Sequence, residues 1–467
     1  MKQAHASIVA RFHASALLVC ALSASGLADT TFQPAGTLGQ WFDPANWSNG
    51  LPGPATNTFV GDSKIAVVKG DTAYGGSLAV GYQDGKDGTI EIADTLGSKL
   101  SANLNLGAAK NSTGLINMTG GTFDGASVTS IGILGKGVFR QLKGTASHNV
   151  LYVGAGKNAG EGEGVYEMNG GWCFVKSAFI GNNSKARVDQ KGGLFVVSGT
   201  SFKIRSAQGA AYNLSDGLLS VDPDAEIGAV QSGDFLQTGG SAIFNKNVYN
   251  GGYLSDGVVA GTGKGSFTIS TGAASTKITG TLYNLEKATI TIRNKSTVTV
   301  GLVDNSRGGT MIVDGAFKNV DGSKTKILNG GTGKITIENE FQRIGVCSID
   351  GDFTQTNGVL AMHVAGFGAD QFCVLRGTGN AVLGGSLWVD FLENTNIQLF
   401  KPIKIIDFAG GSVTGDFQSV ILPTLQDGRS WEIRRGADYF AIEVVPAPAP
   451  LGCLAAGLFV ATRRRRA

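Results

Sequence analysis

The chain of 467 residues contains little charge, little proline and little cysteine or histidine. Only 16% of its residues are charged and 42% are hydrophobic, which excludes a disordered polyelectrolyte and leaves enough apolar side chains for a large core. The 10 prolines are too few for collagen, which also needs glycine at every third position. No apolar run reaches the ~20 residues with which a helix crosses a bilayer.

Cysteine and histidine are also scarce in the body of the chain, between the two terminal segments described below. Its three cysteines are Cys173, Cys347 and Cys373, and an odd number does not make a disulfide framework. At most Cys347 and Cys373 pair, and buried free thiols are the favoured alternative. Only His148 and His363 remain as histidines, far apart in sequence, so we expect neither a zinc site nor any other metal or cofactor.

Glycine, in contrast, is abundant, and it recurs at a regular interval. The 71 glycines are about 15% of the chain, roughly twice the usual ~7%, and each disfavours a helix. A polar turn with glycine precedes a β-prone run six times, as in the segments MTGGTF, MNGGWCFV and QTGGSAIF. The last glycines of these turns are Gly121, Gly144, Gly171, Gly193, Gly217 and Gly240.

The steps between these glycines are 23, 27, 22, 24 and 23 residues, a period that fits one turn of a β-solenoid. Each coil has to bend two or three times, and glycine supplies positive φ at a bend without a side-chain penalty. Strands of successive coils would then pair in parallel around a continuous apolar column. We therefore predict an all-β protein built as a parallel β-helix.

The N-terminus has the pattern of a secretory signal peptide. Lys2 and Arg11 precede a short apolar stretch, residues 14–22, and small residues follow up to Ala28, the expected cleavage position. A membrane anchor is the alternative, although the apolar stretch is too short to span a bilayer. Lipoprotein processing at Cys20 is disfavoured, because that residue lies late in the apolar run.

The C-terminus combines a proline-spaced segment, an apolar stretch of about a dozen residues, 451–462, and four arginines that would stay on the cytoplasmic side. This order of parts resembles the bacterial PEP-CTERM sorting signal, although its usual glutamate is here Ala447. The resemblance implies processing by an exosortase-like enzyme after transient contact with the inner membrane; a plain C-terminal anchor is the alternative. The signal residues are Val445, Pro446, Pro448, Pro450, Arg463, Arg464, Arg465 and Arg466.

Two further segments suggest how the solenoid is closed. Trp41 and Trp47, with the prolines that follow them, are expected to cover the first coil, and stacking on a sugar is the alternative use of these tryptophans. This Trp-x4-Asn-Trp opening and the following coils resemble passenger repeats of PEP-CTERM proteins and autotransporters, which implies a right-handed helix. Residues 351–445 resemble the closing β-module of such proteins, which is not catalytic.

Motifs for chemistry are absent or incomplete. The segments 261–266 and 330–336 lack the spacing of a phosphate-binding loop, so we interpret both as turns. The serious alternative is a polysaccharide lyase or hydrolase, which needs acids and bases on adjacent coils. The acidic pairs Glu161 with Glu163 and Asp222 with Asp224 flank turns and are interpreted as solvated loop charge. We predict no catalytic residue.

The net charge of +3 belongs to the two ends. Without Lys2, Arg11 and the four terminal arginines, 33 basic residues face 36 acidic ones, a balance of −3 that removes the argument for nucleic acid. We therefore expect an exported cell-surface or matrix protein with a structural or adhesive role in contact with extracellular polysaccharide, as in biofilm. The expected segments are 1–28 (signal peptide), 29–60 (cap), 61–350 (solenoid), 351–445 (closing module) and 446–467 (sorting tail).

Overall fold

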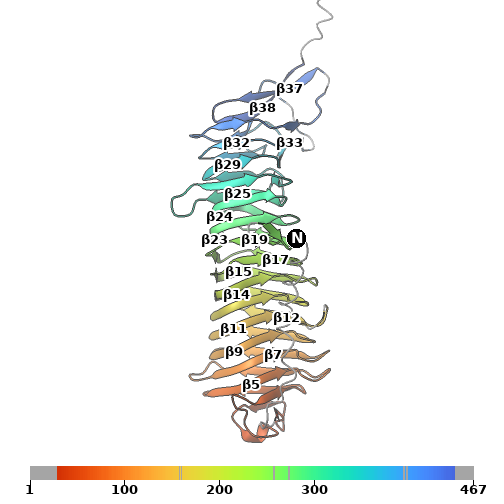
Figure 1. The fold of residues 1–467 in the computed structure, drawn as a ribbon, viewed down its shortest axis with the longest axis vertical. Helices are drawn as coiled ribbons and strands as arrows, with labels where there is room; N and C mark the ends of the chain where they lie inside the picture. Colours follow the sequence, from red (N-terminus) through yellow and green to blue (C-terminus); the bar gives the residue numbers. More distant parts are fainter. Residues whose placement is uncertain are drawn as a thin grey trace, which may run out of the picture.

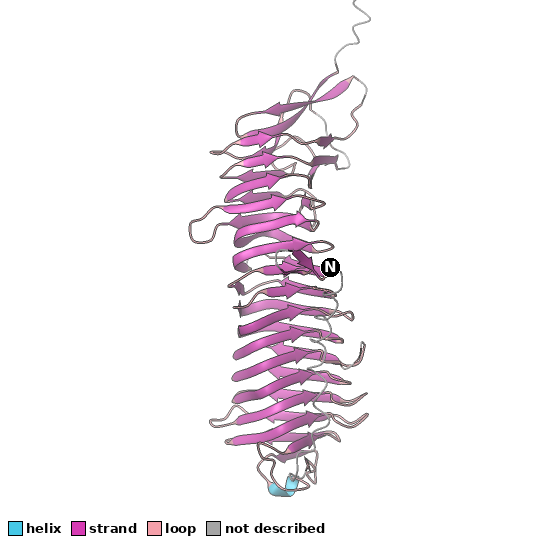
Figure 2. Ribbon diagram, in the orientation of Figure 1, coloured by secondary structure: helices cyan, strands magenta, loops and turns pink. Residues whose placement is uncertain are grey.

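A computed structural model of the chain describes residues 29–447, apart from 157, 159, 256–257, 272–273, 393–394, 396–397 and 427. It is an elongated parallel β-solenoid of about 15 turns, with the first coils at one end of the column and the last at the other (Figure 1). The predicted fold class is therefore confirmed. Almost all regular structure is strand, and the short 3-10 helix η2 (Pro44–Asn46) lies at the N-terminal end of the column (Figure 2).

The strands follow one another around three faces of each coil. In chain order they are β1 (Thr30–Thr31), β2 (Leu38–Gln40), β3 (Asn57–Val60), β4 (Lys64–Val68), β5 (Thr72–Val80), β6 (Gly88–Ile92), β7 (Lys99–Leu106), β8 (Thr113–Met118), β9 (Thr122–Ile131), β10 (Lys136–Gln141), β11 (Thr145–Val153), β12 (Glu163–Met168), β13 (Trp172–Ile180), β14 (Lys185–Ile204), β15 (Ala210–Val221), β16 (Ala225–Ile227), β17 (Ser232–Gln237), β18 (Ser241–Phe244) and β19 (Val248–Asn250).

The second half of the column continues the same order. Its strands are β20 (Tyr253–Ser255), β21 (Val258–Ala260), β22 (Lys264–Ile269), β23 (Ser275–Leu285), β24 (Thr289–Arg307), β25 (Thr310–Lys318), β26 (Thr325–Asn329), β27 (Lys334–Ile337), β28 (Val346–Ile349), β29 (Gly351–Gln355), β30 (Val359–Val364), β31 (Val374–Gly377), β32 (Ala381–Leu383), β33 (Ser386–Phe391), β34 (Ile403–Asp407), β35 (Val413–Gly415), β36 (Ser419–Ile421), β37 (Arg429–Arg435) and β38 (Tyr439–Pro446).

The long strand β14 shows how one coil is built. Its first part pairs in parallel with β12, its middle with the first half of β13, and its end with the second half of β13. One continuous strand thus turns around all three faces. The same parallel register continues past residue 350, through β29, β30 and β33 to β36, without a break at the expected start of the closing module.

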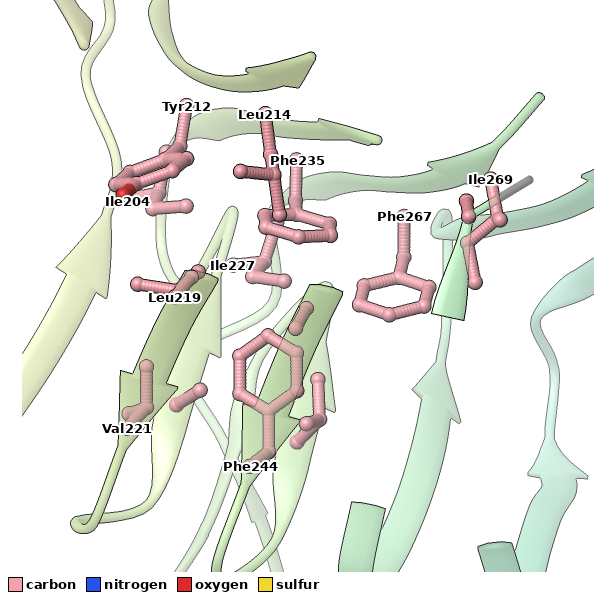
Figure 3. Close-up of a cluster of buried hydrophobic side chains, with 14 of the residues drawn as sticks. Ile204, Tyr212, Leu214, Leu219, Val221, Ile227, Phe235, Phe244, Phe267 and Ile269 are labelled. Carbon is pink, nitrogen blue, oxygen red and sulfur yellow. The ribbon is translucent and has the colours of Figure 1, made fainter. Parts of the chain in front are cut away.

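The core is a column of side chains that point inward from every coil. Along the strands, buried and less buried positions alternate, as in β7 and β8. Aromatic rings stack inside the column: Tyr212, Phe235 and Phe267 come from three successive coils, with ring centroids 6.0 and 5.1 Å apart (Figure 3). Because every coil rests on its neighbours, the apolar surface is buried between coils rather than within one.

The repeated glycines form a column of their own at one bend. All six have positive φ, as the sequence predicts, and each carbonyl lies beneath the next glycine of the column. At Gly171 (φ +79°), an added Cβ would lie 2.3 Å from the Gly144 carbonyl oxygen. That oxygen already accepts hydrogen bonds from the Trp172 amide at 2.9 Å and the buried Gln141 side chain at 3.1 Å. The bend therefore needs glycine for its backbone conformation and for the close approach of coils.

A second column replaces apolar residues with amides. The buried side chains of five successive coils donate one to the next, with nitrogen–oxygen distances of 2.8–3.0 Å. Each asparagine donates its second proton to a backbone carbonyl of the next coil, and Gln355 donates to two backbone carbonyls. Only the first oxygen of the ladder, Asn250 Oδ1, lacks a partner among the described residues. The members of this amide ladder are Asn250, Asn284, Asn305, Asn329 and Gln355.

The ends of the column are closed differently. At the first coil, Trp41 and Trp47 pack with Phe32 in the hydrophobic core. At the last coils, β38 pairs antiparallel with both β34 and β37, so the parallel stack stops there. Val445 and Pro446 belong to β38, while Ala28, Pro448, Pro450 and the four arginines lie outside the described residues.

The glycine column yields a stability prediction. Gly171→Ala should lower the free energy of unfolding by about 2 kcal/mol or more, because the left-handed conformation alone costs an alanine roughly 1–2 kcal/mol and the coil above must also shift. Gly209 has positive φ but open space around it, so Gly209→Ala should lose only the stability that the left-handed conformation costs. Gly301 has neither constraint, so Gly301→Ala should leave the free energy of unfolding almost unchanged. Urea unfolding followed by circular dichroism measures all three; equal effects at Gly171 and Gly209 would contradict close packing of the column.

Candidate functional site

The two tryptophans considered for sugar stacking are in the core. Trp41 is 1% exposed and Trp47 is 4% exposed, and the Trp47 indole nitrogen donates to the Trp41 carbonyl at 2.7 Å. Neither ring has a free face for a sugar. Of the two uses weighed for these residues, packing over the first coil is the one that the structure supports.

An exposed aromatic pair lies instead on β13. Trp172 is 58% exposed and Phe174 is 39% exposed, while the alternating residues Cys173 and Val175 are buried in the core. In register, Trp172 lies between Thr145 of the preceding coil and Leu194 of the next. Two large rings thus face outward from one strand, two residues apart.

A hollow of about 400 Å³ opens beside Phe174 at the bend that follows this face. It extends over β9, β11, β13 and β14, which belong to four successive coils. The three intervals between them, at ~4.8 Å each, make about 14 Å along the column. Asp124, Ser147 and Phe174 form one side in strict register. The hollow is lined by Asp124, Gly125, Ala126, Ser147, His148, Asn149, Phe174, Val175, Lys176 and Ser198, and we call it the β13 groove.

Of the two charged residues in the β13 groove, one has an ion-pair partner and the other has none among the described residues. Asp124 pairs with Lys99 of the neighbouring coil at 3.2 Å. Lys176 is exposed, and no carboxylate pairs with it among the residues that the structure describes. The groove therefore presents an aromatic ring, hydroxyl and amide groups, and one free positive charge.

Beneath the groove lies His148, for which the sequence predicts no metal site. Its ring is packed among Phe123, Phe139 and Tyr166, and its Nδ1 is 2.9 Å from the Thr129 hydroxyl. Burial lowers the pKa of His148 to about 3, and its Nε2 has no hydrogen-bond partner. The histidine is thus neutral in the folded protein and forms part of the core below the groove.

A second hollow, of about 390 Å³, lies further along the column. Phe341, 84% exposed, stands on its rim, and Asn339 accepts two backbone hydrogen bonds that shape the loop carrying this ring. Its lining residues are Asn294, Lys295, Asp314, Asn339, Phe341 and Gln342. Like the β13 groove, it combines amides with an aromatic ring, one carboxylate and one lysine.

Three of the four acidic residues singled out in the sequence contact another coil through their carboxylates. Asp222 accepts from the Asn245 amide at 2.7 Å, and Asp224 accepts from a backbone amide of the next coil at 3.0 Å. Glu161 is 3.6 Å from Lys110, and Glu163 begins β12. None of these four carboxylates lines either hollow.

One acid–base contact escaped the sequence analysis. His363 Nε2 lies 3.3 Å from Glu338, and Arg343 approaches the same nitrogen at 3.4 Å. Burial and the Arg343 charge lower the pKa of His363, against the opposing effect of Glu338. This contact lines neither hollow, and within the described ranges no group of three His, Cys, Asp or Glu side chains is arranged to hold a metal.

The three cysteines are core residues, and the two segments compared with a phosphate-binding loop lie where turns enter strands. Cys173, Cys347 and Cys373 are buried and free, and burial raises the pKa of the first two thiols to about 12. Of the two segments expected to be turns, residues 261–263 and 330–333 are turns, while residues 264–266 and 334–336 already belong to β22 and β27. No helix in the part of the chain that the structure describes is long and apolar enough to cross a membrane.

Among known proteins, no protein-family model and no curated protein matches the chain. The sequence did contain a signal for the exposed pair, because Trp172 and Phe174 alternate with Cys173 and Val175. Either pair satisfies the two-residue period of a strand, so the pattern alone does not tell which one faces outward.

The buried His148 predicts acid sensitivity. Its folded-state pKa is depressed, so below pH ~6.5 only the unfolded chain takes up the proton, and stability falls by about 1.4 kcal/mol per pH unit until pH ~3. A His148→Phe variant should lack this loss, so that wild type loses stability relative to the variant as pH falls. Thermal unfolding from pH 7.5 to 4, with His363→Gln as the companion variant, measures it. If stability falls equally with pH in wild type and His148→Phe, the pKa of His148 is not lowered in the folded protein.

Proposed function

We propose that this protein is an exported bacterial surface or matrix protein whose solenoid is a rigid support for binding extracellular polysaccharide. The observation that carries the proposal is the exposed Trp172–Phe174 pair beside the polar β13 groove. Aromatic rings offer an apolar face to a sugar ring, and the hydroxyl and amide groups of Ser147, Asn149 and Ser198 offer partners for sugar hydroxyls.

The shape of the groove supports a polymer as ligand. It follows four coils along the column axis, and its walls are strands held by backbone hydrogen bonds from coil to coil. Linear chains suit a long open hollow, whereas small molecules are bound in pockets that enclose most of their surface. A rigid wall also keeps the conformational cost of binding low.

Delivery to the surface is the part of the proposal that rests on the sequence. The N-terminal segment up to Ala28 and the tail from Val445 to Arg466 resemble a signal peptide and a PEP-CTERM sorting signal. Between them stands a self-contained column whose strands end at Pro446. The tail would direct the protein to an exosortase-like enzyme and would then be removed.

The runner-up function is a polysaccharide lyase or hydrolase. Asp124 and Lys176 line the same groove, an acid with a base on nearby coils, which is the minimum for a lyase, whereas a hydrolase needs two carboxyl groups. The Lys99 partner of Asp124 and the exposure of Lys176 favour binding without chemistry.

The binding proposal predicts that Trp172→Ser and Phe174→Ser each weaken binding to polysaccharide by about tenfold, since removal of an aromatic anchor typically costs more than 1 kcal/mol. Trp388→Ser, at another exposed tryptophan on β33, is the matched control and should bind as wild type. Affinity electrophoresis in gels containing dextran or polygalacturonate measures the effect. Equal retardation of all four proteins contradicts the proposal; shortening of the polymer that Asp124→Asn abolishes supports the enzyme instead.

The sorting proposal predicts a processed tail. In the native organism, mass spectrometry of the mature protein should place the N-terminus at Asp29 and the C-terminus before Arg463. Replacing the four arginines with glutamine should cause the unprocessed form to accumulate, because the positive block holds the tail at the cytoplasmic face. A mature chain that still ends at Ala467 would contradict sorting and favour a plain anchor.

A further inference from the structure

The β13 groove presents an unpaired positive charge beside an aromatic ring. The mature chain has more acidic than basic residues, and the groove's own carboxylate, Asp124, is paired with Lys99. Lys176 is left exposed without a carboxylate partner, next to Phe174 and the amide of Asn149. An uncompensated charge among sugar-binding groups distinguishes polymers by their own charge.

The backbone at Lys176 is held in place by the coil above it. The register of β13 and β14 shifts between Val175 and Ser177, so Lys176 lies at the bend. Gly199 passes so close that an added Cβ would lie 2.2 Å from the Lys176 carbonyl oxygen, and the Ser177 and Thr200 hydroxyls are 2.9 Å apart. The lysine therefore leaves the wall of the groove from a fixed point, which favours a defined contact over a diffuse one.

We propose that the β13 groove binds an acidic polysaccharide, a polymer with uronate residues, and that Lys176 pairs with a carboxylate of the chain while Phe174 contacts a sugar ring. This inference rests on the proposed function and names the class of polymer. A single free lysine suits a chain that is already recognised through rings and hydroxyl groups. Nucleic acid also stacks on aromatic side chains, but a groove for it has several cations along the backbone, so the observations favour the polysaccharide.

The test compares one polymer with and without its charge. Dissociation constants of the purified protein are measured by calorimetry for polygalacturonate, the same polymer with its carboxylates reduced to alcohols, dextran sulfate and a single-stranded oligonucleotide. We expect wild type to prefer polygalacturonate over the reduced polymer by about fivefold at low salt, with the preference fading at high salt. Lys176→Gln should remove that preference and leave binding of the reduced polymer unchanged.

Lys318→Gln is the matched control, because Lys318 ends β25 on a distant coil, is exposed, and has no ion pair with any residue that the structure describes. It should retain the full preference. If Lys176→Gln still prefers polygalacturonate, or if dextran sulfate or the oligonucleotide binds more tightly than polygalacturonate, the inference is wrong. The proposed function would survive that result as long as Trp172→Ser weakens binding of the reduced polymer, and both fail if Trp172→Ser binds every polymer as wild type does.

Discussion

The structure depends on one constraint, which is that each residue rests on its equivalent in the coil below, ~4.8 Å away. At that distance a side chain at one bend meets the backbone of the next, so Gly171 tolerates no Cβ above the Gly144 carbonyl. The same spacing brings Asn284 and Asn305 within hydrogen-bond distance and stacks Phe235 on Phe267. Columns of like residues are therefore the unit in which this protein is stabilised, and a substitution acts on two interfaces at once.

Stacking also governs the outer surface, where like charges in one column would repel each other. Some charged residues are matched across coils instead: Arg140 lies 2.7 Å from Glu167 in register, and Lys203 lies 2.8 Å from Glu226. Lys176 has no such partner among the described residues, and in the proposed function its charge is available to a ligand.

The bend glycines and the β-solenoid were predictable because their period is local and repeated, and φ is positive at all six positions that the sequence identified. The amide ladder was not, because its members are 34, 21, 24 and 26 residues apart, with the hairpin of β20 and β21 inserted in the first interval. Which side chains lie on the surface is harder still to predict from the sequence. Trp41 and Trp172 are the same residue type, and only the closure of the first coil over Trp41 decides that one is buried and the other exposed.

In the proposed function, a rigid groove with one exposed ring pair beside it and one unpaired lysine would have modest affinity for one segment of polymer. Polysaccharides, however, repeat the same segment many times, and a matrix protein is present in many copies on one surface. Linking many weak contacts raises the overall affinity without any new contact, because each further binding event becomes intramolecular. The solenoid suits this arrangement, since its length separates the groove from both ends of the column and its backbone loses little freedom on binding. Weak single sites on a stiff support therefore fit an adhesive role better than a tight pocket would.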